Sequence, residues 1–126
     1  VSCAMGAICA KRKEKDVKNL SIFGRNLGIA FQITDDLIGI MGDSKVTKKP
    51  VGNDKKKILK VFGKSKAAKK DVQTAVNTIR SLGIEEEVRK KALQYATKAT
   101  KSLDSYSGND KKEMVSLLDF VVKRSI

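Results

Sequence analysis

Apolar side chains recur along this chain every three or four residues, the spacing of one face of an α-helix. No stretch alternates apolar and polar residues for long enough to indicate a β-strand. Glycine, asparagine and proline separate the periodic stretches, as is typical of helix ends and loops. The predicted helices cover residues 1–13, 16–41, 55–62, 68–82, 85–105 and 111–124. The pattern therefore predicts an all-α fold, a bundle of helices without an internal repeat.

The helix predicted at 16–41 is the most apolar part of the chain, and Asp16 is its predicted N-cap. Its buried face is predicted to contain Leu20, Phe23, Leu27, Ala30, Phe31, Thr34 and Ile38. The helix predicted at 1–13 has a shorter apolar row, made of Val1, Met5, Ile8 and Cys9. The three methionines are expected in the core, and the two tyrosines, Tyr95 and Tyr106, on an amphipathic surface or interface.

Adjacent aspartates, Asp35 and Asp36, stand within this apolar helix. Gln32 precedes Asp36 by one helical turn, so Gly28, Gln32, Asp36 and Gly39 form a stripe that is polar or lacks a side chain. Carboxylates held together in an apolar setting repel each other and lose solvation, which a shared cation or ligand would relieve. A solvated helix edge would also account for the pair, because most carboxylates are exposed.

The composition suits one soluble helical domain, with 126 residues, 40% of them hydrophobic, one proline and no tryptophan. No apolar run approaches the roughly 20 residues that span a bilayer, so no membrane span is expected. Cys3 and Cys9 point in different directions on one helix, which disfavours a disulfide and fits the reducing cytoplasm. The absence of histidine excludes Ser-His-Asp and Cys-His catalysis and disfavours a zinc site.

The net charge of +13 is concentrated in one region. Residues 44–70 contain eleven lysines, no arginine and one acidic residue, a local excess of ten of the thirteen positive charges. Charge of this density suggests a polyanion, a solvated face or a loop that binds phosphate groups. Nucleic acid is the weakest of these interpretations, because the chain has few aromatic residues and no base-reading motif.

The run GRNLGIAFQITDDLIGIMGD, followed by KVTKKPVGND, resembles the second aspartate-rich region of the trans-isoprenyl diphosphate synthases, or polyprenyl synthetases. That family reads LGxAFQxxDDxxD and then a GKPxGxD stretch. The resemblance is strong over residues 24–54, and the later helices are similar with less specificity. It implies that residues 1–126 are a single all-helical partial domain, the C-terminal half of such a synthase. The N-terminal half and a loop after Asp54 are then absent.

The resemblance also implies an activity. In that family Mg²⁺ holds the diphosphate of an allylic prenyl substrate, which condenses with isopentenyl diphosphate, and the full-length enzyme is a homodimer. Asp35 and Asp36 correspond to metal ligands and, with Gln32, to catalytic residues. Phe31, Gln32 and Lys49 correspond to substrate-binding residues. A fragment of this kind is expected to be inactive alone, since the first aspartate motif has no counterpart in the chain.

The chain departs from the family pattern at two site positions. Gly39 stands where the fullest motif has its last aspartate, and Lys48 stands where glycine is usual. Asp43 could assist the pair through water. The alternative function that the sequence leaves open is a non-catalytic basic helical module that binds a polyanion or a protein partner.

Overall fold

A computed structural model of the chain describes residues 1–41 and 69–123. Five helices occur in these ranges: α1 (Ser2–Cys9), α2 (Glu14–Met41), α4 (Lys69–Ser81), α5 (Ile84–Lys101) and α6 (Asn109–Lys123). The same residues contain no β-strand, so the all-α prediction is confirmed. The helix predicted at 55–62 lies outside the described residues.

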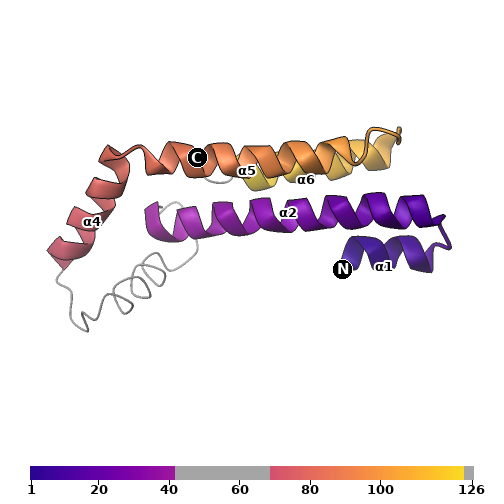
Figure 1. Cartoon of the computed structure of the whole chain (residues 1–126), viewed down its shortest axis with the longest axis horizontal. Coiled ribbons are helices and arrows are strands. Elements are labelled where there is room, and N and C mark those ends of the chain that lie inside the picture. The colour runs from indigo at the N-terminus through magenta and orange to yellow at the C-terminus, as the bar shows by residue number, and fades with distance from the viewer. Residues whose placement is uncertain (42–68, 124–126) are drawn as a thin grey trace.

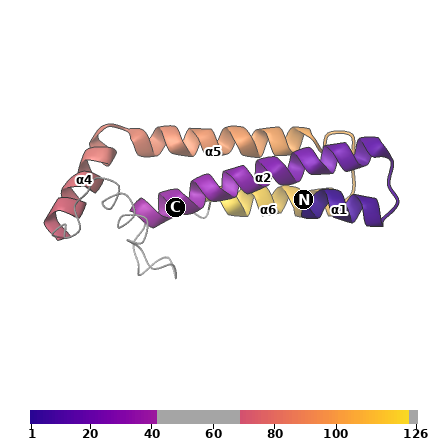
Figure 2. The same ribbon diagram turned by 60° about the horizontal axis from the view of Figure 1, so that its bottom comes forward.

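The long helix α2 is the centre of the arrangement (Figure 1). It lies alongside α5 for much of its length, and this is the most extensive helix pair of the fold. α1 folds back against the first part of α2, and α6 packs against both α2 and α5 (Figure 2). α4 turns away from the bundle where α5 begins, close to the end of α2 that carries the aspartates (Figure 1).

The core forms where α2, α6 and the end of α5 meet. Its fully buried side chains are Phe23, Ala99, Leu103 and Leu118. Leu20, Leu27 and Met114 are partly buried and pack against this cluster. The periodicity of α2 therefore predicted its buried face correctly at most positions, because the tightest part of the seam coincides with the most regular three- and four-residue spacing. Phe31 is the exception, with 40% of its surface exposed.

The prediction for the first helix is wrong in both length and face. α1 ends at Cys9, and the chain reverses at Lys11, whose φ of 52° is left-handed. Met5 and Ile8 are 56% and 60% exposed, so Met5 is not a core residue, whereas Ala7 is only 3% exposed. Small residues face α2 here because the two helices approach closely.

Gly24 is the residue that allows this approach. A methyl group at Gly24 would lie 3.0 Å from Cys3 Sγ and 3.1 Å from Cys3 Cβ, closer than most side chains pack. The half-buried Cys3 thus occupies the space that a side chain at position 24 would need. Both cysteines are free thiols, as expected.

The prediction of Asp16 as the N-cap of α2 is also wrong. α2 begins two residues earlier, at Glu14, and the carbonyl oxygen of Lys13 accepts from the Asp16 amide at 2.9 Å. Asp16 lies inside the first turn, where a carboxylate stabilises the positive end of the helix dipole. Its side chain has long-range partners, described below.

Of the later helix ends, the one at Gly83 is confirmed. Gly83 has φ 69°, a left-handed conformation that glycine adopts without strain, and it separates α4 from α5. The three glutamates of the first turn of α5 and the lysines of its last turn match the helix dipole. α5 ends four residues before its predicted end, because the chain turns to bury Leu103. No described helix is long and apolar enough to cross a membrane.

Candidate functional site

Helix α2 presents the candidate site near its C-terminal end. The Gln32 amide nitrogen Nε2 donates to Asp36 Oδ1 at 2.8 Å, one turn further along the helix. Both side chains are exposed, as is Gly28 one turn before Gln32. The predicted stripe therefore exists from Gly28 to Asp36. It turns inward at Gly39, which is buried.

The two aspartates differ in environment. Asp36 is exposed and accepts the Gln32 hydrogen bond, whereas Asp35 is half-buried. Adjacent helical positions are rotated by about 100°, so the two carboxylates leave the helix in different directions. Each carboxylate therefore offers its oxygen atoms to a different part of a larger ligand.

Phe31 lies on the open side of α2, beside the candidate site. It lines a groove of about 380 Å³ between α1, α2 and α6, together with Leu117 and Phe120. These three side chains are 40%, 48% and 63% exposed. The sequence placed Phe31 in the core, and the structure places it at the edge of this apolar groove.

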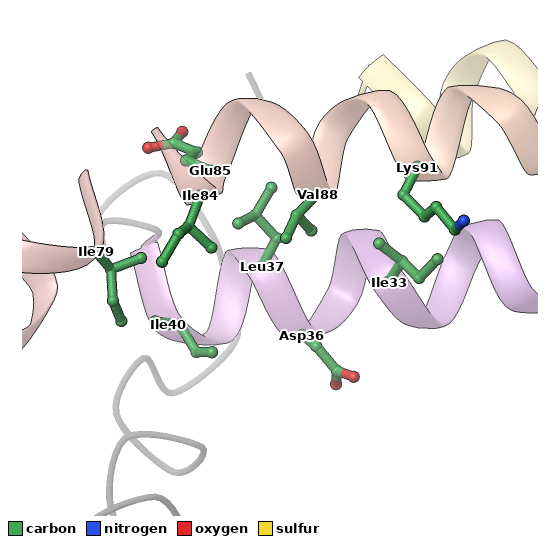
Figure 3. A pocket seen from close by; sticks show the side chains of 9 residues that line it. All are labelled: Ile33, Asp36, Leu37, Ile40, Ile79, Ile84, Glu85, Val88 and Lys91. Atoms are coloured by element: carbon green, nitrogen blue, oxygen red, sulfur yellow. The ribbon is translucent and has the colours of Figure 1, made fainter. Parts of the chain in front are cut away.

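A second cavity, of about 390 Å³, adjoins Asp36 on the side of α4 and α5. Figure 3 shows its apolar residues gathered between the helices, with the carboxylate of Asp36 directed away from them. Its walls are formed by Ile33, Leu37, Ile40, Ile79, Ile84 and Val88. Glu85 and Lys91 also line it. The residues next to Asp36 thus offer space for an apolar group without blocking the carboxylate.

The described residues contain no group of three or more Asp, Glu, Cys or His side chains that could hold a metal ion together. Mg²⁺ does not require such a group, because it usually retains waters and binds one or two carboxylates plus the phosphates of a substrate. Asp35 and Asp36 offer oxygen donors of this kind. The donor chemistry of the pair therefore fits Mg²⁺ held jointly with a diphosphate. Lys49, Asp43 and Asp54 lie outside the described residues.

An interaction that the sequence did not reveal joins the first turn of α2 to the segment that follows α5. The hydroxyl of Tyr106 donates to Asp16 Oδ1 at 2.7 Å and accepts from Asn19 Nδ2 at 3.3 Å. Arg12 Nε lies 3.1 Å from Asp16 Oδ2. The Tyr106 hydrogen bond is the main cause that lowers the pKa of Asp16, and the same bond raises the pKa of Tyr106. No local signal predicts this cluster, since 90 residues separate Asp16 from Tyr106.

Together these features describe a class of protein: an all-α domain whose central helix carries an exposed glutamine, an exposed aspartate and a half-buried aspartate beside apolar cavities. The chain belongs to the polyprenyl synthetase family, whose sequence profile matches residues 1–99. This confirms the resemblance of the FQITDD region and extends it to the start of the chain.

Relatives with known names agree with the family. A geranylgeranyl diphosphate synthase of Mycobacterium tuberculosis is 56% identical over 41% of this chain. A geranylgeranyl diphosphate synthase of Saccharolobus solfataricus is 47% identical over 48% of this chain. A (2E,6E)-farnesyl diphosphate synthase of the same Mycobacterium species is 41% identical, also over 48%. These matches cover only 15%, 19% and 18% of the relatives' own lengths. No solved structure matches the chain.

Proposed function

We propose that this chain is part of a Mg²⁺-dependent trans-prenyltransferase that condenses an allylic prenyl diphosphate with isopentenyl diphosphate. Its share of the reaction is the second aspartate-rich half of the diphosphate site. The observation that carries the proposal is the family match together with the outward row of Gln32 and Asp36 on α2. Named relatives that are prenyl diphosphate synthases support it.

The residues have separate roles in this proposal. Asp35 and Asp36 hold Mg²⁺, which would draw electron density from the diphosphate as it leaves the allylic carbon. Gln32 holds Asp36 in place through their 2.8 Å hydrogen bond, so that the carboxylate is oriented before a ligand binds. Phe31 provides an apolar surface beside the site, and Lys49 a positive charge for the diphosphate.

In this proposal the two sets of metal-binding carboxylates come from different parts of the enzyme. The chain supplies one set of carboxylates, and the opposing aspartate motif comes from the part of a synthase that residues 1–126 do not contain. The same proposal treats residues 1–126 as one partial domain, inactive alone, of a cytoplasmic homodimeric enzyme. The family's homologues are several times longer than the segments they share with this chain, which supports this division.

Asp35→Ala tests the proposal in a synthase that contains both halves. We expect Mg²⁺-dependent binding of geranyl diphosphate to weaken and kcat/KM to fall by roughly a hundredfold or more, because a metal contributes several kcal/mol. Asp104→Ala is the matched control, since Asp104 is an exposed carboxylate in the turn after α5. It should leave both quantities unchanged.

The opposite outcome would favour the basic helical module. In that case Asp35→Ala leaves Mg²⁺-dependent binding as it was. The chain then binds a polyanion such as RNA with an affinity that falls steeply as salt rises and is indifferent to Mg²⁺. These two sets of results exclude each other for Asp35.

A further inference from the structure

Helix α1 is apolar on two opposite sides, and α2 covers one of them. Residues Ser2–Cys9 include no charged side chain. Ala7 is buried on the side toward α2, whereas Met5 and Ile8 are exposed. Since each helical residue is rotated by about 100° from the one before it, Met5, Ile8 and Cys9 leave α1 on one side. A helix that is apolar all round is typical of a protein interior, so the outer side of α1 has the composition of an interface.

The groove between α1, α2 and α6 extends this surface beyond α1. Val1, at the start of α1, lines the groove together with Leu117 and Phe120 of α6. Val1 is 94% exposed, and both α6 residues are exposed as well. Exposed apolar surface of this extent marks a site of interaction. The exposed apolar residues of α1 and of the groove are called the open face: Val1, Met5, Ile8, Phe31, Leu117 and Phe120.

The groove leads along α2 to the candidate metal site. Gly24, Gly28 and Phe31 line it, and they follow one another at steps of four and three residues. Asp35 comes four residues after Phe31, so it continues the same row of α2. A segment that lies in the groove therefore ends beside Asp35, where the proposed function needs a second set of carboxylates.

We propose that the open face is the docking surface for the rest of the synthase, which places an apolar helix in the groove and its own aspartates opposite Asp35. This inference rests on the proposed function, because the partner is the part of the enzyme that residues 1–126 do not contain. The named relatives exceed this chain by more than its own length, so that part is long enough to cover the face. The uncharged surface of α1 matches a partner that is apolar at the contact.

Cys9 is a native reporter of this contact, because it is an exposed free thiol on the outer side of α1. The test compares the 126-residue chain with a two-part synthase, in which residues 1–126 are joined to the first part of the Mycobacterium tuberculosis relative. Both are treated with iodoacetamide, and labelling at Cys9 is followed by peptide mass spectrometry. We expect Cys9 to react about tenfold more slowly or less in the two-part protein, since a covered thiol reacts only when the contact opens.

Gln94→Cys supplies the matched control thiol. Gln94 is exposed on α5, and it lies two residues after the buried Ala92, so it leaves the helix on the opposite side. Its thiol should react at the same rate in both proteins. A cooperative urea transition of the two-part protein shows that it is folded, so that equal reactivity of Cys9 in the two proteins would then mean an uncovered face.

Phe120→Lys tests whether one partner covers both helices of the open face. The residue lies on α6, whereas the reporter Cys9 lies on α1. A lysine in the groove should restore the fast reaction of Cys9 in the two-part protein and leave the urea midpoint of the 126-residue chain unchanged, because Phe120 is exposed there. Leu82→Lys is the control, since Leu82 is an exposed apolar residue outside the open face, and it should leave Cys9 protected.

The outcomes separate this inference from the proposed function. Asp35→Ala in the two-part protein should keep Cys9 protected while activity is lost. If activity and Mg²⁺-dependent binding survive in Asp35→Ala and Cys9 stays protected, the proposed function fails and the docking surface stands. Equal reactivity of Cys9 in the two folded proteins overturns the docking surface, as does protection that persists in Phe120→Lys. Protection of the 126-residue chain alone that rises with its concentration, together with a dimer mass in light scattering, also overturns it, because a second copy then occupies the face.

Discussion

Tyr106 links the first and last thirds of the chain through one hydroxyl group. It lies after the end of α5, and its partner Asp16 lies in the first turn of α2. The ammonium of Lys111 donates to the backbone oxygen of Tyr106 at 3.0 Å, which adds α6 to the same cluster. This group of residues holds the end of the bundle opposite the aspartates.

Tyr106→Phe removes only this hydroxyl. We expect the urea midpoint of unfolding to fall, because the Asp16 carboxylate and the Asn19 amide each lose a partner. Tyr95→Phe is the control, since the Tyr95 ring faces the Lys98 ammonium at 5.0 Å rather than a carboxylate. An equal midpoint for wild type and Tyr106→Phe would show that water replaces the bond without loss.

The effect of Tyr106→Phe should depend on pH in a defined direction. The pKa of Asp16 lies below its ordinary value of 3.8, so its stabilisation is complete above that pH and is lost as pH falls through the lowered pKa. The pKa of Tyr106 lies above its ordinary value of 10.0, so its stabilisation is complete below that pH and is lost as pH rises further. The difference in urea midpoint between the two proteins should therefore be largest between these limits and shrink outside them.

At the site itself, the sequence predicted which side chains are neighbours on α2 better than it predicted which of them are buried. Helical spacing alone places Gln32 one turn before Asp36, and the structure joins them at 2.8 Å. The burial of Phe31 could not be read from spacing, because it depends on which helix covers that side of α2. The metal ligation and catalytic roles of Asp35 and Asp36 remain predictions.

At the scale of elements, the close contact between α1 and α2 depends on a glycine, Gly24, which has no side chain. Gly24 and Gly28 both lie on α2, but only Gly24 faces a neighbour, Cys3. A methyl group at Gly28 would meet no atom within 4 Å. The two glycines therefore allow a matched comparison, because they lie in the same helix but only one of them has a close neighbour.

Alanine at these two positions should have opposite effects. Gly28→Ala should stabilise the protein by about 0.5–1 kcal/mol, because alanine favours the helix more than glycine does. Gly24→Ala gains the same propensity but crowds Cys3, and overpacking costs about 1–3 kcal/mol. Urea unfolding of both variants measures this difference, and equal stabilities would mean that α1 shifts without cost.

Helix ends were predictable where a residue type itself enforces the end. Gly83 ends the α4 segment because it adopts φ 69° freely. The end of α1 was missed because a lysine, Lys11, takes the left-handed conformation, which residue preference does not favour. The start of α2 was missed because the Asp16 side chain serves a distant tyrosine instead of capping its own helix.

At the scale of the whole molecule, one cluster holds three helices together. Phe23 comes from α2, Ala99 from α5 and Leu118 from α6, while Leu103 follows the end of α5. Leu103 is 1% exposed and lies between helices that are far apart in the sequence. Loss of its side chain should loosen all three helices at once.

Leu103→Ala should lower the free energy of unfolding by about 2–5 kcal/mol, the cost of a buried leucine replaced by alanine. That is a large share of the stability of a small domain. Leu82→Ala is the matched control, because Leu82 is 68% exposed, and it should change stability by less than about 0.5 kcal/mol. Similar losses from both variants in urea unfolding would contradict the core described here.

The sequence by itself determined the all-α class, the order of the helices, the family, and the row of Gln32 and Asp36, because all of these depend on spacing along one helix or on local motif. Only the tertiary structure decided that Phe31 and Met5 are exposed and that Ala7 faces α2. It also decided the pairing of Tyr106 with Asp16. These features depend on which surfaces of distant segments meet, and helical periodicity carries no information about the partner that covers a face.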